Sequence, residues 1–331
     1  ILVKNGAVLE TLSSISHFVF DKTGTLTEGK MRVVEIKTTD EVNQQQLLTQ
    51  IAAIEQRSEH PVARSIVAEA ELQNLNYREV SISNIQYQSG HGISGEVNGQ
   101  KILIGQLKWL EGLAVTTNQT LGQHAEALEQ QATTPIHVAI DGEHIALLGI
   151  TDALRSDAKR MVNNLKQDQI TTTLLSGDQT RVALAVAAQL GGMKVIAEVR
   201  PEEKHQVIKD LQQQGEQVAM VGDGINDAPA LIQANVGIAV GSGTDVSIES
   251  ADIVLMDDEL DKIRQAAALS RRTLKTIRQN IGISIVYNLI MVPLAVAGFI
   301  TPLIAAISMP ISSLLVIGNA GRIRTLFNKK G

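Results

Sequence analysis

Apolar runs alternate with amphipathic stretches through the second half of the chain. Helical periodicity over residues 156–168 and 180–190 precedes short apolar runs at 173–175 and 194–196, and a helix opened by Pro201 precedes a run at 218–221. An earlier apolar run, residues 18–20, ends at Asp21. Strands that alternate with helices predict an α/β fold with a parallel, doubly wound sheet.

The pattern changes between about residues 34 and 146, where helices mix with short hairpins. Thr39 or Asp40 is placed to cap a helix, and the pairs Asn98-Gly99 and Asp141-Gly142 have the residue types of tight hairpin turns. These features predict an inserted α+β domain at 34–146, which divides the α/β domain into residues 1–33 and 147–275. Residues 1–16 are expected to form an amphipathic helix before the first strand.

Residues 279–321 contain no charged side chain. That length is enough for two membrane spans of about 20 residues each, and the break near 298–302 predicts a transmembrane helix hairpin at 276–331. Basic residues flank the stretch on both sides: Arg271, Arg272, Lys275 and Arg278 precede it, and Arg322, Arg324, Lys329 and Lys330 follow. They predict that both ends of the hairpin, and with them residues 1–275, lie in the cytoplasm. We expect a multi-pass protein of the plasma (inner) membrane. A buried helix pair of a soluble protein is the alternative.

Composition narrows the classes of function. A net charge of −6 and an isoelectric point near 5.7 argue against a nucleic-acid binder, which normally carries a basic surface. The absence of cysteine excludes disulfides, zinc fingers and thiolate catalysis within these residues. The sequence opens at Ile1 with no initiator methionine and no signal-peptide pattern, so we interpret it as part of a longer protein.

Asp21 stands where an apolar strand ends and a turn rich in hydroxyls and glycine begins. A carboxylate in this place, with backbone N–H groups and hydroxyls converging on it, is suited to nucleophilic attack on a phosphoryl group. An ordinary turn aspartate is one alternative. A phosphate-binding loop at residues 24–31 is another, and it fails because Met31 replaces the hydroxyl that would hold magnesium.

Two further acid-bearing turns follow apolar strands, at residues 176–178 and 222–229. Ligands bind at the carboxyl ends of the strands in open parallel sheets, so the three turns point to one site. Carboxylates gathered around a phosphate require a cation, which implies Mg²⁺, with Asp223 as the first candidate ligand.

The three turns resemble the signatures of P-type cation-transporting ATPases. Residues 21–25 match the phosphorylation motif DKTGT, and the other two turns resemble TGD and GDGxNDxP, with Ser176 in place of the usual threonine. The resemblance implies a haloacid-dehalogenase-like fold, ATP and Mg²⁺ as substrate and cofactor, and an aspartyl-phosphate at Asp21. It also implies that Lys22 and Thr23 lie beside the nucleophile and that Asp152 lies near a hinge. Ser176, Gly177 and Asp178 would contact the phosphoryl group, and Lys204 would neutralise its charge. Magnesium would be surrounded by Asp21, Thr23 and Asp223, with Asp227 nearby. A solvated lysine at 204 and a helix N-cap at 178 are the alternatives.

Position 23 separates two functions. Phosphatases of this fold carry a second aspartate two residues after the nucleophile, whereas this chain has Thr23, so an aspartyl-phosphate lacks an in-built base. A lasting phosphoenzyme suits a pump that changes conformation before it releases phosphate. The dephosphorylating TGE motif of such pumps does not occur in these residues, so the chain alone is expected to stall after phosphorylation. A membrane-tethered phosphatase and an ATP-sensing regulator are the rival classes.

The predicted insert contains Glu55, the run Ser-Glu-His-Pro at 58–61 and Gly-His-Gly at 90–92. A dinucleotide-binding loop fails here because a strand-like segment, rather than a helix, follows the glycines. The combination resembles the nucleotide-binding domain of the heavy-metal (P1B) branch of P-type ATPases, which implies ATP contacts from Glu55, His60, Gly90, Gly92 and Gly105. The other histidines have no metal-ligand spacing and are expected to be surface or structural residues: His17, His91, His124, His137, His144 and His205.

Polar residues within a membrane span usually mark a pathway. Tyr287 and Asn288 lie in the first predicted span, and Met309 and Ser313 lie one helical turn apart in the second. A thioether is a soft ligand that suits Cu(I). The pattern resembles the copper-transporting subgroup, which implies Cu⁺ as cargo, a metallochaperone as a candidate partner, and a Cys-Pro-Cys site in preceding spans. Lipid packing of Met309, an interfacial anchor at Tyr287 and a zinc cargo are the alternatives.

Overall fold

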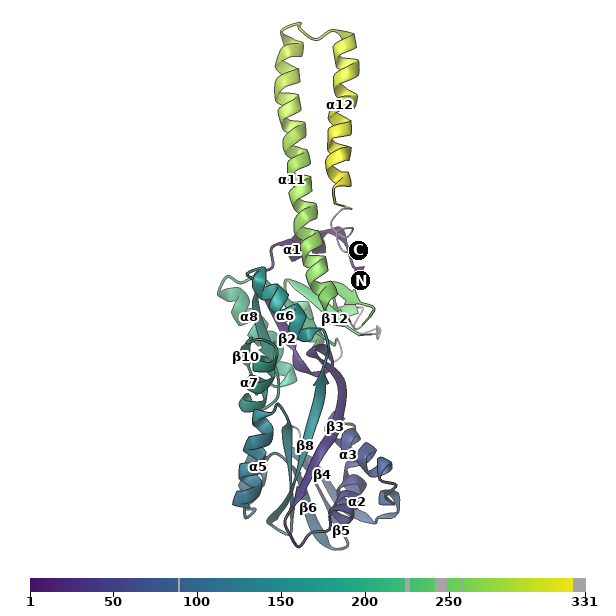
Figure 1. Ribbon diagram of the computed structural model, residues 1–331, viewed down its shortest axis with the longest axis vertical. Helices are drawn as coiled ribbons and strands as arrows, with labels where there is room; N and C mark the ends of the chain where they lie inside the picture. The colour runs from purple at the N-terminus through teal and green to yellow at the C-terminus, as the bar shows by residue number, and fades with distance from the viewer. Residues whose placement is uncertain (89, 224–226, 242–248, 258, 324–331) are drawn as a thin grey trace.

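The chain forms two sheets, one above the other along the long axis of Figure 1, and a pair of long helices that extends beyond them. The computed structural model describes residues 1–88, 90–223, 227–241, 249–257 and 259–323. The first sheet has seven strands within these residues, in the order β1-β13-β12-β11-β2-β9-β10. They are β1 (Leu2–Val3), β2 (His17–Asp21), β9 (Thr171–Leu175), β10 (Lys194–Ile196), β11 (Val218–Gly222), β12 (Val236–Val240) and β13 (Ile253–Leu255). All neighbours are parallel except β1 and β13, so the predicted parallel sheet is confirmed.

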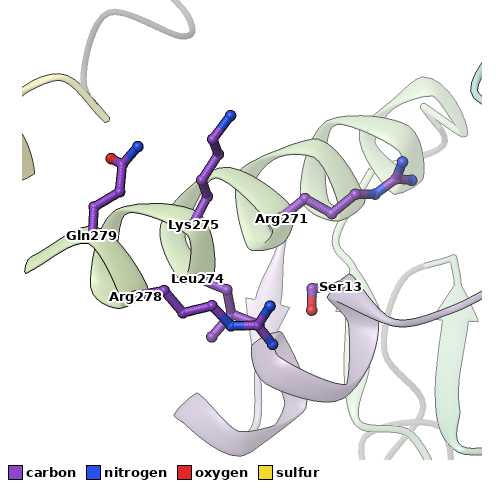
Figure 2. Close-up of a pocket in the computed structure, with 6 residues that line it drawn as sticks. All are labelled: Ser13, Arg271, Leu274, Lys275, Arg278 and Gln279. Carbon is purple, nitrogen blue, oxygen red and sulfur yellow. The ribbon is translucent and has the colours of Figure 1, made fainter. Parts of the chain in front are cut away.

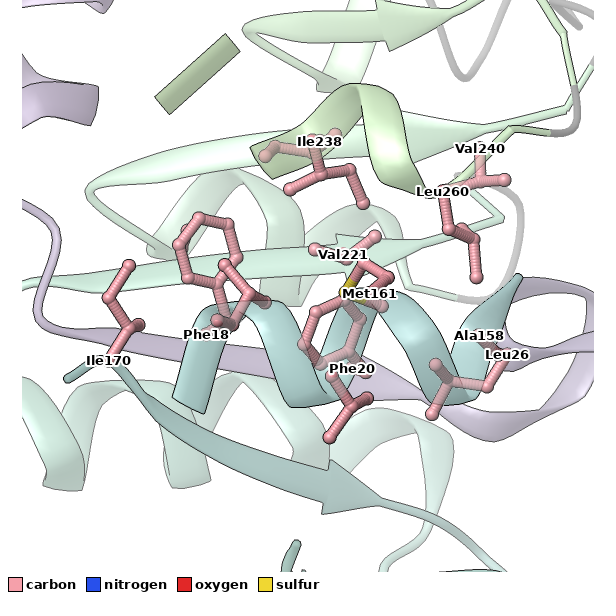
Figure 3. Packing of buried hydrophobic residues seen from close by; sticks show 14 of the residues in the cluster. Phe18, Phe20, Leu26, Ala158, Met161, Ile170, Val221, Ile238, Val240 and Leu260 are labelled. Carbon is pink, nitrogen blue, oxygen red and sulfur yellow. The ribbon is translucent and has the colours of Figure 1, made fainter. Parts of the chain in front are cut away.

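Helices cover both faces of this sheet. On one face lie α1 (Gly6–Ser13), α6 (Ala158–Gln167), α7 (Thr180–Gln189) and the start of α11 (Asp261–Val296); on the other lie α8 (Lys204–Gln213) and α9 (Ala228–Gln233). Side chains alternate along β2, so that Phe18 and Phe20 enter the core drawn in Figure 3 while Val19 enters the core beneath α8 and α9. Burial on both faces explains why β11, β12 and β13 carry no polar side chain.

The second sheet is antiparallel, with the order β3-β8-β7-β6-β5-β4. Its strands are β3 (Thr27–Thr38), β4 (Ile82–Gln88), β5 (Gly92–Val97), β6 (Gln100–Gly105), β7 (Thr134–Ile140) and β8 (Glu143–Leu154). Helices α2 (Gln44–Glu55) and α3 (Pro61–Leu72) cover one face, and α4 (Leu107–Gly112) and α5 (Gln119–Gln130) cover the other. The predicted α+β insertion into an α/β fold is therefore confirmed.

The two predicted hairpin turns are confirmed by their backbone geometry. Asn98-Gly99 joins β5 to β6 and Asp141-Gly142 joins β7 to β8. The φ angle is 51° at both Asn98 and Asp141, and it is 78° and 88° at the two glycines. Positive φ at both central residues is the conformation of a type I′ turn, which the right-handed twist of the strands favours.

Two predicted helix starts are wrong by a few residues. The first helix begins at Gly6 rather than near Ile1, because residues 2–3 pair with β13 and the Asn5 side chain accepts a hydrogen bond from the first turn. The helix expected after Thr39 or Asp40 is instead capped by Asn43. In both places an asparagine close in sequence provides the capping oxygen.

Strands β3 and β8 connect the two sheets. Each has twelve residues, and they pair from Thr27 opposite Leu154 to Thr38 opposite Ala146. The Asp152 carboxylate fixes the end nearest the first sheet, accepting from Thr27 Oγ1 at 2.6 Å and from the Lys30 N–H at 2.9 Å. The two sheet units also meet where Arg181 of α7 forms an exposed ion pair with Glu126 of α5 at 2.8 Å.

Helix α11 leaves the first sheet unit and continues without interruption past residue 276, and α12 (Pro302–Gly321) returns beside it (Figure 1). The break predicted near 298–302 is confirmed: α11 ends at Val296, and the Thr301 side chain caps α12. By length and hydropathy α11 is a candidate membrane span among the described residues, and the apolar stretch Ala306–Gly321 is shorter. Arg324, Lys329 and Lys330, on which the predicted orientation partly depends, lie outside the described residues.

Candidate active site

Three strand ends meet at one edge of the seven-stranded sheet. Strand β2 lies between β9 and β11, all three are parallel, and Asp21 is level with Leu175 of β9. The turns that follow these strands therefore share the carboxyl edge of the sheet, where ligands bind in such folds. The structure thus brings together the turns that the sequence singled out. Residues 224–226 of the third turn lie outside the described residues.

A buried lysine joins two carboxylates at this edge. The Lys204 ammonium donates to Asp21 Oδ1 at 2.5 Å and to Asp227 Oδ1 at 2.7 Å. Lys204 reaches them because Pro201 opens a short 3₁₀ turn, after which α8 begins at residue 204. The alternative of a solvated lysine at 204 is wrong, since only 7% of the residue is exposed.

Burial and charge alter the acid–base properties of this cluster. Loss of water and then the charge of Asp227 raise the pKa of Asp21 to about 7, although Lys204 opposes the shift. Burial also raises the pKa of Asp227. Burial alone would lower the pKa of Lys204, but the two carboxylates outweigh it and raise that pKa. Lys204 therefore stays a cation at neutral pH, where Asp21 is close to the midpoint of its titration.

Asp178 pairs with Lys22 instead of capping α7. The Lys22 ammonium is buried and forms an ion pair with the Asp178 carboxylate. Ser176 Oγ donates to Asp178 Oδ2 at 3.0 Å and accepts from the Asp178 N–H at 3.1 Å. Gln179 precedes α7 without a side-chain cap, so the N-cap considered for Asp178 is wrong. These contacts fix the turn at 176–178, which includes Gly177, against the residue that follows Asp21.

The turn that carries Thr23 is held by an arginine that the sequence did not reveal. This turn, Lys22–Leu26, includes Gly24 at a φ of 74°, which favours glycine, and Asp223 lies against Gly24. Arg155 donates to the carbonyl oxygens of Thr25 at 2.9 Å and Gly24 at 3.0 Å. No sequence signal marks Arg155, because its partners are backbone atoms 130 and 131 residues away.

Three carboxylates at this edge offer oxygen atoms of the kind that a hard divalent cation binds. Asp227 Oδ2 is buried and has no hydrogen-bond partner among the described residues. The charge of Asp223 contributes to the raised pKa of both Asp21 and Asp227, so all three carboxylates are near one another. Carboxylate oxygens are ligands that Mg²⁺ prefers. No three acidic or histidine side chains in the described ranges are gathered as a ready metal site, and the Lys204 ammonium bridges Asp21 and Asp227.

The residues predicted to bind ATP lie in the second sheet unit, apart from Asp21. Glu55 ends α2 and is buried, which raises its pKa to about 7. His60 caps α3 through its Nδ1 atom, which accepts from the Val62 N–H at 3.3 Å. Helix α2 packs against β5, the strand that begins at Gly92. Glu55 and Gly92 therefore belong to neighbouring elements.

Two of the predicted ATP-binding glycines are required by packing. Gly92 and Gly105 lie opposite each other on β5 and β6. A Cβ atom on Gly92 would lie 2.3 Å from the Ile104 carbonyl oxygen and 2.6 Å from the Trp109 ring, and one on Gly105 would lie 2.3 Å from a backbone oxygen. Gly90 differs, because its φ is 74° and no atom of the described residues lies within 4 Å on its Cβ side. Gly90 is thus the glycine whose backbone a ligand can approach.

The helix hairpin does not gather the four residues predicted to contact a transported metal. The Tyr287 hydroxyl lies 3.2 Å from Ser308 Oγ and lines a cavity of about 650 Å³ between α11 and α12. Asn288, Met309 and Ser313 are exposed on the hairpin, Met309 by 69%.

Comparison with known proteins identifies the family. Residues 15–235 match the haloacid dehalogenase-like hydrolases. A probable copper-exporting P-type ATPase V of Mycobacterium tuberculosis is 41% identical over 324 residues, which cover 98% of this chain and 42% of that protein. A zinc-transporting PIB-type ATPase in the E2.Pi state has a similar structure, with a TM-score of 0.71 and 35% identity over 97% of this chain and 52% of that chain. A catalytic CPx-ATPase domain matches with a TM-score of 0.61 and 29% identity over 81% of this chain and 94% of that chain.

The chain therefore belongs to the haloacid dehalogenase-like hydrolase family and, within it, comprises the catalytic region of a P-type ATPase of the heavy-metal branch. The resemblance drawn from residues 21–25 and the predicted fold class are both confirmed. The chain spans about two-fifths of the length of the Mycobacterium tuberculosis relative.

Proposed function

We propose that this chain is the ATP-hydrolysing part of a pump that moves Cu(I) across a membrane through an aspartyl-phosphate at Asp21. The observation that best supports the phosphoryl-transfer step is the buried contact of Lys204 with Asp21 and Asp227 at the end of β2. In this proposal residues 1–33 and 147–275 are the phosphorylation domain, 34–146 the nucleotide-binding domain and 276–331 a transmembrane hairpin.

In the proposed reaction a carboxylate oxygen of Asp21 attacks the γ-phosphorus of ATP. The bond from phosphorus to the bridging oxygen breaks, and ADP leaves with the electron pair. Lys204 neutralises charge on the transferred group, and the Ser176 hydroxyl and the Gly177 backbone contact it from the neighbouring turn. Lys22, held by Asp178, keeps a positive charge beside the nucleophile.

Mg²⁺ would be held by Asp21, Thr23 and Asp223, with Asp227 nearby, and it would supply positive charge to the phosphate oxygens. Asp21 must be ionised to attack. Because burial raises the pKa of Asp21 to about 7, any added positive charge at this edge increases the reactive fraction near neutral pH.

ATP is proposed to bind the second sheet unit through Glu55, His60, Gly90, Gly92 and Gly105. The open backbone at Gly90 supports a direct contact, while Gly92 and Gly105 shape the strand pair beside it. Because these residues and Asp21 belong to different sheet units, transfer of the γ-phosphoryl requires the units to approach each other. Strands β3 and β8 are the connection that would bend.

Cu(I) is our first choice of cargo and zinc the second. The relative named as copper-exporting is 41% identical to this chain, and the solved structure named as zinc-transporting is 35% identical to it. Met309 offers a soft thioether. Tyr287, Asn288, Met309 and Ser313 would contact the ion together with groups from other helices, and a metallochaperone would deliver it.

The test is phosphorylation of the full-length protein with γ-labelled ATP and Mg²⁺, followed by acid quenching. A pump gives label that survives acid, is released by hydroxylamine, and is lost in Asp21→Asn. Asp210→Asn on the exposed side of α8 is the matched control and should keep its label. Rapid free phosphate without bound label would favour a phosphatase, and the absence of both would favour a regulator. Stimulation of turnover by Cu(I) or by Zn²⁺ in vesicles decides between the two cargoes.

A further inference from the structure

A cavity of about 520 Å³ lies between α1 and α11, far from the candidate active site along the first sheet unit (Figures 1 and 2). Its lining consists of Ser13 from α1 and five residues from two turns of α11: Arg271, Leu274, Lys275, Arg278 and Gln279. Figure 2 shows Ser13 beside the stretch of α11 that carries Arg271 and Arg278. None of these residues takes part in the reaction proposed above.

The lining is strongly cationic. Three of the six residues carry a positive charge and none carries a negative one. Arg271 Nε is buried and has no hydrogen-bond partner in the described part of the chain, and the same holds for Arg272 Nε beside it, outside the lining. A buried donor without a partner is costly, and a guanidinium with an unused N–H favours a phosphate or carboxylate oxygen. The cavity is therefore suited to an anion.

The position of the cavity indicates which anion. Gln279 is the first residue of the stretch without charge, and the exposed side chains that follow it on α11 are large and apolar, including Ile281, Ile285 and Leu289. Residues 271 to 279 span about 12 Å of helix. In a bilayer the layer of lipid headgroups begins where the hydrocarbon ends. The three cations therefore lie at headgroup level if the hairpin crosses the membrane.

We propose that Arg271, Lys275 and Arg278 form a binding site for the phosphate of an anionic phospholipid, with Leu274 contacting the start of its acyl chains. The inference rests on the membrane placement of the hairpin proposed above. Anionic lipid at this site would hold α1 of the phosphorylation domain to the base of the membrane helices.

The test measures lipid binding to the full-length protein in detergent, titrated with phosphatidylglycerol or phosphatidylcholine and read by native mass spectrometry. Phosphatidylglycerol should bind at least about tenfold more tightly. A charge-assisted hydrogen bond to the phosphate contributes about 1.5 kcal/mol, so Lys275→Gln and Arg278→Gln should each weaken phosphatidylglycerol binding about tenfold. Phosphatidylcholine binding should not change.

Arg272→Gln is the matched control, because Arg272 lies on the same turn of α11 and also has a buried Nε without a partner among the described residues, but does not line the cavity. It should weaken binding less than twofold. An equal loss in Arg272→Gln would mean diffuse attraction to charge and would overturn the site. Equal binding of the two lipids, as expected if a preceding chain segment fills the cavity, would overturn it as well.

Competition with millimolar inorganic phosphate distinguishes a lipid headgroup from free phosphate as the ligand of this cavity. It should displace phosphatidylglycerol less than twofold, since it lacks acyl chains, and complete displacement would overturn the lipid assignment. Phosphorylation of Asp21 in the same variants shows that they are folded. If the protein binds phosphatidylglycerol but is never phosphorylated, the proposed pump function is refuted and the lipid site remains. If the protein is phosphorylated but shows no lipid preference, the lipid site is refuted and the proposed pump function remains.

Discussion

Replacing Lys204 by methionine tests the contact on which the candidate active site depends. The two side chains have similar length, so the change removes a charge and leaves most of the packing. Asp21 and Asp227 are 6% and 1% exposed, so water can replace little of what Lys204 provides. Removing one partner of a buried ion pair costs about 3–5 kcal/mol, because an uncompensated charge stays behind.

The cost should depend on pH, and its sign follows from the raised pKa of Asp21. Lys204 at present opposes that rise, so its loss moves the pKa of Asp21 above 7. The destabilisation is therefore greater at pH 8 than at pH 6, because Asp21 is largely ionised in the parent protein at pH 8 and largely protonated in both proteins at pH 6. The rate of phosphorylation should fall at neutral pH and recover in part as the pH is raised.

Pulse proteolysis in urea at pH 6 and pH 8 measures the free energy of unfolding, and labelling with γ-labelled ATP measures the phosphorylation rate. Lys209→Met, on the exposed side of the same helix, is the matched control and should cost less than about 0.5 kcal/mol. Adding Asp227→Asn to Lys204→Met should restore part of the lost stability, since one unpaired charge is then gone. If Lys204→Met is as stable as Lys209→Met at pH 8 and its pH–rate profile does not move, the reasoning about this cluster is wrong.

Three further predictions concern the second sheet unit. Gly92→Ala should cost about 1–3 kcal/mol, because its Cβ would meet a carbonyl oxygen at 2.3 Å and the Trp109 ring at 2.6 Å. Gly122→Ala on α5, where nothing lies within 4 Å, should instead stabilise by about 0.5–1 kcal/mol; Trp109 fluorescence in urea measures both, and equal effects would contradict the packing argument. Burial raises the pKa of Glu55 from 4.5 to about 7, so the native state loses stability as the pH rises through that range. Glu55→Gln should therefore gain about 3 kcal/mol at pH 8 and nothing near pH 4.5, and a gain independent of pH would refute the assignment. Burial and the nearby His144 lower the pKa of His137 to about 3, so stability is lost as the pH falls from about 6.5 toward 3. The acid limb of unfolding, followed by circular dichroism, should be flatter in His137→Gln than in the parent.

The sequence predicted those parts of the fold that depend on local patterns. The run at 218–221 is apolar throughout and forms a buried strand, the Asx-Gly pairs formed the expected turns, and Gly298 to Pro302 marked the break between the long helices. Acids at successive strand ends predicted a shared edge because parallel topology brings such ends together.

Contacts between distant residues could not be predicted in the same way. Arg155 holds the turn after Asp21 through backbone carbonyls, which leave no trace in side-chain spacing. The partner of Asp178 depends on how two strand ends face each other, so a local cap seemed equally suitable from the sequence. Gly92 and Gly105 resembled a ligand loop, but their small size is also needed for Trp109 to lie across the strand pair.

Helix α11 has a mechanical consequence. Its 36 residues form one rod about 54 Å long, with its base packed on the first sheet unit and its far end at the turn before α12. A lever of that length converts a tilt of about 10° at the base into a displacement of about 9 Å at the tip. Small rotations of the first sheet unit can thus be carried along α11 as far as its last turn, where Pro293 lies inside the helix.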